Sequence, residues 1–218
     1  MIYDENKIKH MRVTLFPGVN EMSKIMNRTD IINKLISNNG YHRYLEIGVK
    51  HNINFNEIDI DNKEGVDPAG KCKYPISSDD FFNNLEDSIF YDIIFIDGLH
   101  LKDQVLRDIN NSLKHLNSGG VIIMHDCSPE NEKYTKINRN GTVWEAFVEL
   151  RMSREDLFMC VVDIDYGCGI IRKGNQKIFP REAIKFALLE SKRKEILNLI
   201  SADEFDEFTD MCKKMENK

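Results

Sequence analysis

Short apolar runs, separated by longer stretches with apolar residues at helical spacing, dominate the chain. Runs that read as strands span residues 44–49, 64–66, 91–96, 121–124 and 158–162. Most of them lack an alternation of apolar and polar residues, which is typical of strands covered on both faces. The pattern therefore predicts a buried sheet whose strands are mostly parallel.

Helical periodicity fills the gaps between these runs. The clearest example lies between two predicted strands, where apolar residues recur at Leu101, Val105, Ile109, Leu113 and Leu116, and Gly119-Gly120 supplies a stop signal. Further helices are predicted over residues 30–37, 79–85 and 142–152, and from Pro180 onward with a break near residues 201–203. Such strand–helix–strand units build parallel sheets.

A second pattern begins within the last of these runs, at residues 158–162. Residues 161–173 read as two strands joined at Asp165-Tyr166-Gly167, so an antiparallel pair is expected to close one edge of the sheet. Together the elements predict an α/β fold, a Rossmann-like and mostly parallel sheet with helices on both faces. We expect one domain over residues 1–218, with a helical lead-in (1–40), a core (41–174) and C-terminal helices (180–218).

Composition narrows the class of protein. The net charge is -6 and no long basic run occurs, which disfavours nucleic acid as a partner. The N-terminus is charged, and no stretch of about eighteen apolar residues occurs, so we expect no membrane association and a cytoplasmic location. The five cysteines lack C-x-x-C spacing, which favours reduced thiols over disulfides or a structural zinc site.

Polar residues come at the end of each predicted strand. They are Glu46 and Gly48 at the first, Asp67 at the second, Ser78-Asp79-Asp80 after a weaker third element, Asp97 and His100 at the fourth, and His125-Asp126 at the fifth. Taken singly, most of them are better explained as a turn former, helix cap or surface residue, by roughly two to one. Together they indicate a site, because open α/β sheets bind ligands at the carboxyl ends of their strands.

The strand ends also indicate the ligand. An acid such as Asp67 at the end of a second strand is placed to hold a ribose diol. After Gly48 the chain lacks the G-x-G-x-x-G pattern that brings backbone close to a pyrophosphate. A phosphate-free nucleoside therefore fits better than NAD.

The order and spacing of several motifs resemble class I S-adenosylmethionine-dependent methyltransferases. These motifs are YLEIGV, GVDP, SDDFF, DIIFIDGLH, QVLRDINNSLKHLNSGGVIIMHDC, VWEAF and DIDYGCGIIRK. The chain is most similar to the small bacterial branch related to sugar O-methyltransferases such as the macrocin and mycinamicin enzymes. That resemblance implies a seven-stranded sheet whose last two strands are antiparallel.

The resemblance also implies cofactor-binding roles. Glu46 and Gly48 match the first S-adenosylmethionine motif, Asp67 matches the ribose-binding acid, and Asp79 matches the position that contacts the adenine amine. Asp97 is expected to border the cofactor as well. The chain departs from its relatives at Lys50-His51-Asn52, where they usually carry further glycine.

Catalytic roles are implied for the fourth and fifth strand ends. In the macrolide-sugar enzymes the corresponding acids bind a divalent metal and a His three positions after the first acid is the base; Asp97, Asp126 and His100 match these positions. His125 stands where relatives carry a second acid. Three alternatives follow: Mg²⁺ held by two carboxylates and water, a softer ion such as Mn²⁺, or no metal with His125 in acid–base work.

Several functions remain open at this point. We expect an enzyme that O-methylates a saccharide or small glycoside, with a small-molecule N-methyltransferase as the alternative acceptor chemistry. A catalytically silent nucleoside-binding scaffold and an NAD-dependent oxidoreductase are the rival classes. The amphipathic helices after Pro180 are the expected interface if the protein forms a homo-oligomer.

Overall fold

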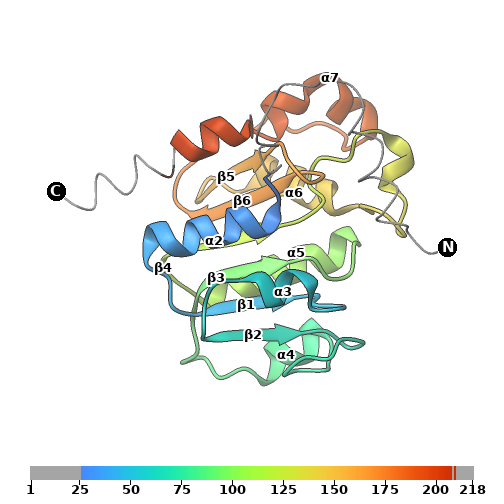
Figure 1. Cartoon of the computed structure of the whole chain (residues 1–218). Helices are drawn as coiled ribbons and strands as arrows, with labels where there is room; N and C mark the ends of the chain where they lie inside the picture. Colours follow the sequence, from blue (N-terminus) through green and yellow to red (C-terminus); the bar gives the residue numbers. More distant parts are fainter. Residues whose placement is uncertain (1–25, 208, 210–218) are drawn as a thin grey trace, which may run out of the picture.

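A seven-stranded sheet organises the protein, which is described here as a computed structural model covering residues 26–207 and 209 (Figure 1). The strands lie in the order β2-β1-β3-β4-β6-β5-β7. Their bounds are β1 (Tyr44–Ile47), β2 (Lys63–Val66), β3 (Tyr91–Ile96), β4 (Leu116–Met124), β5 (Leu157–Val162), β6 (Cys168–Lys173) and β7 (Leu199–Ile200).

Helices cover both faces of this sheet. They are α2 (Arg28–Asn39), α3 (Ile53–Glu57), α4 (Ser78–Asn84), α5 (Lys102–Lys114), α6 (Val143–Ser153), α7 (Phe186–Ile196) and the 3₁₀ helix η1 (Glu132–Thr135). One apolar core lies between the sheet and α4, α5, α6 and α7, and a second lies under α2. Figure 1 shows α2 and α5 on opposite sides of the strands.

Strand directions confirm the predicted fold class. β1 pairs in parallel with β2 and β3, and β3 pairs in parallel with β4. β6 runs antiparallel to both β4 and β5, as expected for the closing pair. Because β2 and β3 flank β1 on opposite sides, the strand order reverses there, and a ligand site is expected beyond the carboxyl ends of β1 and β3.

The start of α2 is fixed by local chemistry. Asn27 caps the helix by accepting the Thr29 and Asp30 backbone N–H groups, and the Asp30 side chain accepts the Asn27 N–H in return. Gly40 ends the helix in the left-handed conformation. The predicted helix over 30–37 is therefore confirmed and begins at Arg28, next to the carboxyl edge of the sheet.

Some element predictions are wrong in detail. The helix predicted up to Leu116 ends at Lys114, and the Gly119-Gly120 signal lies inside β4. The weaker third element before Ser78 is reduced to one parallel bridge between Val66 and Tyr74. The seventh strand comes instead from residues 199–200, where the sequence pattern had predicted helix, because β5 offers them an open edge.

Parts of the predicted lead-in and C-terminal helices lie outside the described residues. Within the described tail, residues 181–185 are not helical, and helix resumes at residue 202 after β7. Among the described residues, no helix has the length and apolar character needed to cross a membrane.

Candidate active site

Backbone pairing brings the strand ends together. The Asp97 N–H donates to the Ile47 carbonyl at 2.8 Å, and the His125 N–H donates to the Ile96 carbonyl at 3.1 Å. These bonds extend the ladders one residue beyond the strands. They place the side chains that follow β3 and β4 at one edge, as the sequence predicted.

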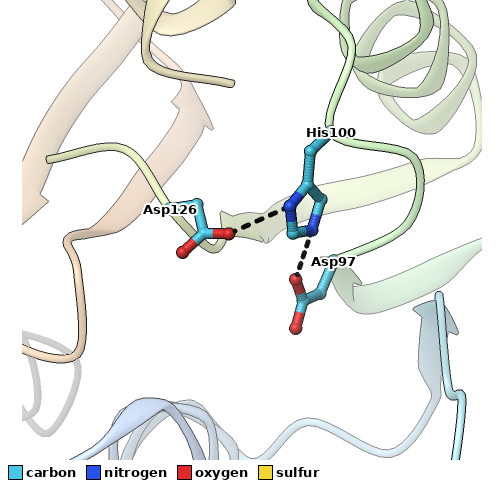
Figure 2. A group of neighbouring side chains, drawn as sticks. All are labelled: Asp97, His100 and Asp126. Carbon is cyan, nitrogen blue, oxygen red and sulfur yellow. Dashed lines mark hydrogen bonds and ion pairs between the residues drawn. The ribbon is translucent and has the colours of Figure 1, made fainter. Parts of the chain in front are cut away.

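His100 lies between two carboxylates (Figure 2). Its Nε2 is 3.2 Å from Asp97 Oδ1, and its Nδ1 is 3.2 Å from Asp126 Oδ2. The Nδ1 atom also lies 2.5 Å from the backbone carbonyl oxygen of Arg139. A carbonyl can only accept a hydrogen bond, so Nδ1 carries the proton in the neutral ring. Asp97 Oδ1 can also only accept, so Nε2 binds Asp97 when the ring is protonated on both nitrogens, and Nε2 is the nitrogen that lacks a proton when the ring is neutral.

Two glycines allow this arrangement. A Cβ on Gly48 would lie 2.2 Å from the Asp97 carbonyl oxygen, and Gly48 has a φ of 92°. A Cβ on Gly141 would lie 2.1 Å from the His100 carbonyl oxygen. Both positions therefore require glycine, because the backbone that carries Asp97 or His100 passes directly over them.

The environment of His100 suits a base. Burial by itself would lower the pKa of His100, but its hydrogen bonds to Asp97 and the Arg139 carbonyl, with the Asp97 and Asp126 charges, raise that pKa. A raised pKa means a stronger affinity of the ring for a proton. His100 thus has the geometry and the chemistry of a proton acceptor.

His125 has a different character. It is buried, with Nδ1 3.1 Å from Asp126 Oδ1 and 3.5 Å from Asp97 Oδ1. Burial would lower the pKa of His125, but these carboxylates outweigh that effect and raise the pKa well above its usual value. His125 Nδ1 also lies 3.2 Å from Arg28 Nη1. The raised pKa favours the charged form of the ring, and the acid–base role considered from sequence stays a prediction.

Sequence reasoning missed Arg28 and Asp165. Arg28 Nη1 donates to Asp97 Oδ2 at 2.8 Å, and Arg28 Nε donates to Asp165 Oδ2 at 2.8 Å. His125 Nε2 lies 3.5 Å from Asp165 Oδ1. Asp165 follows β5, which runs parallel to β4, so the strand-end argument could have included it; nothing in the sequence pattern marks Arg28.

The two acids bound by Arg28 hold their negative charge strongly. Burial would raise the pKa of Asp97, but the His125 charge and hydrogen bonds from His100 and His125 bring it well below its ordinary value. Burial likewise opposes ionisation of Asp165, yet His125 and Arg28 lower its pKa to about 2. Both are carboxylates across the physiological range.

Glu46 lies on the same rim but is held differently. Its Oε2 accepts a hydrogen bond from the Tyr44 hydroxyl at 2.5 Å and one from the Asn54 amide at 2.9 Å. Burial is the main cause that raises the pKa of Glu46, to about 7, against these hydrogen bonds. Glu46 can therefore carry a proton near neutral pH and act as a hydrogen-bond donor.

The loop after β1 forms without the glycines of the relatives. Lys50 and Asn52 take the left-handed conformation, with φ of 44° and 59°. Asp67 stabilises this loop, because its Oδ2 accepts the Lys50 N–H at 2.8 Å and its Oδ1 accepts the Ala69 N–H at 2.8 Å. Asp67 thus joins the loops that follow β1 and β2, where the cofactor was predicted.

Asp79 lies apart from the His100 cluster. In the first turn of α4, its Oδ1 accepts from the Gln104 amide at 3.1 Å and lies 3.4 Å from Arg107 Nε. Both partners belong to α5. Its predicted contact with adenine stays a prediction.

Donor spacing alone would allow a metal ion. One ligand atom from each of Asp97, His100 and Asp126 lies within 4.8 Å of the others. The donor atoms are nevertheless already engaged by Arg28 and by the imidazole nitrogens. A divalent ion would have to displace these partners, so the residues present do not fit one.

Part of the chain, including the residues of this edge up to Asp126, matches a known protein family. Residues 33–127, from within α2 to the residue after Asp126, match a family model described as a methyltransferase domain, Methyltransf_24. The fold is a methyltransferase fold. No curated protein matches the chain.

The chain is similar to solved structures of methyltransferases. SAH-bound methyltransferase PaMTH1 of Podospora anserina is 14% identical, with a TM-score of 0.52, covering 69% of this chain and 80% of that chain. An O-methyltransferase of Bacillus cereus in complex with SAH is also 14% identical, with a TM-score of 0.48, covering 68% and 82%. At this identity the likeness concerns the fold, and the methyl acceptor has to be argued from the site.

Proposed function

We propose that the protein transfers a methyl group from S-adenosylmethionine to a hydroxyl oxygen, with a saccharide or small glycoside as acceptor. The observation that carries the proposal is His100, held between Asp97 and Asp126 at the carboxyl edge of a methyltransferase fold. A hydroxyl needs a base when it attacks, and His100 is the group placed and tuned to be one. The methyltransferase-domain match and the SAH-bound PaMTH1 structure support the cofactor.

The reaction is a single displacement. The acceptor oxygen attacks the methyl carbon, the bond between that carbon and the sulfonium sulfur breaks, and S-adenosylhomocysteine leaves. The hydroxyl proton passes to His100 Nε2, the nitrogen left unprotonated when Nδ1 binds the Arg139 carbonyl. Because the sulfonium is already an activated leaving group, catalysis consists mostly of placement and proton removal.

The cofactor is assigned to the loops after β1 and β2. Asp67 would hold the ribose, Gly48 would let the cofactor approach the backbone, and Glu46 would face the methionine end. Support comes from the reversal of strand order at β1 and from the Asp67 carboxylate, which already organises both loops. Asp79 keeps its proposed role at the adenine.

An aromatic pair next to His125 supports a saccharide acceptor. The Tyr134 and Tyr166 rings lie 5.7 Å apart, and the Tyr166 ring meets the His125 ring edge-on at 6.5 Å. Tyr166 is also 43% exposed. Aromatic faces attract the weakly positive C–H edges of apolar groups, and the C–H face of a sugar ring offers such edges. A sugar packed on this pair would lie beside the His100 cluster.

The first experiment is calorimetric titration of the protein with S-adenosylmethionine, followed by an assay for S-adenosylhomocysteine with sugar and glycoside acceptors. We expect micromolar binding and acceptor-dependent turnover. Binding without turnover on any acceptor would favour a silent nucleoside-binding scaffold, and turnover only on amines would favour the N-methyltransferase alternative. A melting temperature raised by NAD but not by S-adenosylmethionine would point to the oxidoreductase.

A further inference from the structure

Arg28 places a guanidinium group against the carboxylates that would otherwise attract a cation. It donates to Asp97 Oδ2 and Asp165 Oδ2, each at 2.8 Å. We infer that Arg28 is the resident cation of this site and makes the protein independent of a divalent metal. The catalytic meaning of this inference rests on the proposed function, but the claim about cation binding does not.

Both oxygens of the Asp97 carboxylate already face a nitrogen of this chain. Oδ2 binds Arg28, while Oδ1 lies 3.2 Å from His100 Nε2 and 3.5 Å from His125 Nδ1. Both oxygens are thus engaged by nitrogen donors or cations. A metal ligated by Asp97 would have to displace Arg28 or one of the imidazoles.

Asp126 is engaged in the same way. Its Oδ1 accepts a hydrogen bond from the Asn140 amide at 2.5 Å and lies 3.1 Å from His125 Nδ1. Its Oδ2 lies 3.2 Å from His100 Nδ1. The second carboxylate expected to bind a metal is therefore occupied on both oxygens as well.

The balance of charges in the site also disfavours a divalent ion. Three basic side chains, Arg28, His100 and His125, face three acidic ones, Asp97, Asp126 and Asp165. An added divalent ion would meet the guanidinium at close range in a partly buried setting, where like charges repel strongly. A guanidinium instead supplies fixed charge and directional donors, and it cannot dissociate from the chain.

The start of α2 positions the Arg28 side chain. Arg28 is the first residue of α2, its backbone N–H also lies 3.4 Å from Asp165 Oδ2, and its side chain is 29% exposed. The capped start of α2 therefore points the guanidinium at the rim. An ordinary structural ion pair would show the same contacts, so the test has to measure cation binding rather than stability.

The test is titration of Mn²⁺ into the purified full-length protein, followed by electron paramagnetic resonance. We expect no saturable binding to the wild type, and a site that binds at least about tenfold more tightly in Arg28→Met. Arg28→Lys keeps the charge and should still exclude the ion. Lys34→Met is the matched control, because Lys34 lies on the same helix and pairs with Asp206 at 2.7 Å, away from the rim.

Saturable Mn²⁺ binding to the wild type would overturn the inference. A folded Arg28→Met variant that binds Mn²⁺ no more tightly than Lys34→Met would overturn it as well. If Arg28→Met does not fold, the wild-type titration and Arg28→Gln still decide the matter. In the methyl-transfer assay, chelated wild type should keep full activity, and loss of activity restored by Mg²⁺ or Mn²⁺ would also overturn the inference. Absence of methyl transfer would count against the proposed function alone, because Mn²⁺ binding needs no turnover.

Discussion

The carboxyl edge of the sheet has two halves that are built in different ways. Beyond β3 and β4, the polar cluster of Asp97, His100, His125 and Asp126 is made of side chains that bind one another. Beyond β1 and β2, the cofactor loops (residues 48–52 and 67–72) are tied together by Asp67, and the first of them has left-handed backbone at Lys50 and Asn52. In the proposed function, the first half moves the proton and the second receives the cofactor.

This difference explains why the two halves should respond differently to mutation. In the proposed function, one substitution in the polar cluster should affect turnover, because each of its side chains contacts another member of the cluster. The cofactor loops distribute their work over several backbone groups, so one substitution should change affinity or stability more modestly.

The largest effect is expected at the centre of the polar cluster. His100→Asn should lower turnover on the order of a hundredfold or more, because Asn cannot accept the hydroxyl proton, while S-adenosylmethionine affinity is kept. Turnover and calorimetric affinity would be measured together, with His42→Asn as the control because His42 is exposed on another loop. Near-normal turnover of His100→Asn would remove the proposed base.

A smaller effect is expected in the cofactor loops. Asp67→Asn should weaken S-adenosylmethionine binding about tenfold with little change in turnover at saturation, because an amide offers one accepting oxygen where the carboxylate offers two. Asp61→Asn, at an exposed position before β2, is the control for the calorimetric titration. Unchanged affinity in Asp67→Asn would place the ribose elsewhere.

The coupling between Asp97 and His100 should be visible as a pH shift. Asp97 contributes to raising the pKa of His100, so Asp97→Asn should lower that pKa. His100 acts as a base only when deprotonated, so the acid limb of the turnover profile should move to lower pH by about one unit. Asp103→Asn, exposed in the first turn of α5, should leave the limb unchanged. If the acid limb of Asp97→Asn stays at the wild-type pH, Asp97 does not set the pKa of His100.

The smallest expected effect is a gain in stability. Lys50 has a φ of 44°, a conformation that costs residues with a Cβ but not glycine. Lys50→Gly should therefore stabilise the protein by about 0.5 to 1 kcal/mol, measured by denaturant unfolding, after allowance for the larger entropy of glycine in the unfolded chain. His51→Gly, at a neighbour outside the left-handed set, should destabilise it instead. An equal response in both variants would mean that the left-handed backbone at Lys50 is not strained.

Strand periodicity carried most of the fold prediction. The continuous apolar runs at β1, β3 and β4 predicted buried parallel strands, and their ends correctly placed Asp97, His100, His125 and Asp126 on one edge. This works because parallel strands share a direction, so residues that follow them meet in space. The roles of these residues, and those of Glu46, Gly48, Asp67 and Asp79, stay predictions.

What escaped prediction depended on partners distant in the sequence. The residues of β7 are helix-compatible by themselves and become a strand because the β5 edge is free to pair. Arg28 gives no local signal, since an arginine at a helix start is ordinary, and its contacts lie 69 and 137 residues away.

The sequence by itself determined the architecture, the acidic and basic residues available at the carboxyl edge, and the absence of a pyrophosphate-binding glycine pattern. Tertiary structure alone decided which of these residues bind one another, and therefore that His100 lies between Asp97 and Asp126, that His125 contacts three carboxylates, and that Arg28 pairs with Asp97 and Asp165. The physical reason is that periodicity is a local property of the chain, whereas charge and protonation depend on every group within a few ångströms, whatever its position in the sequence.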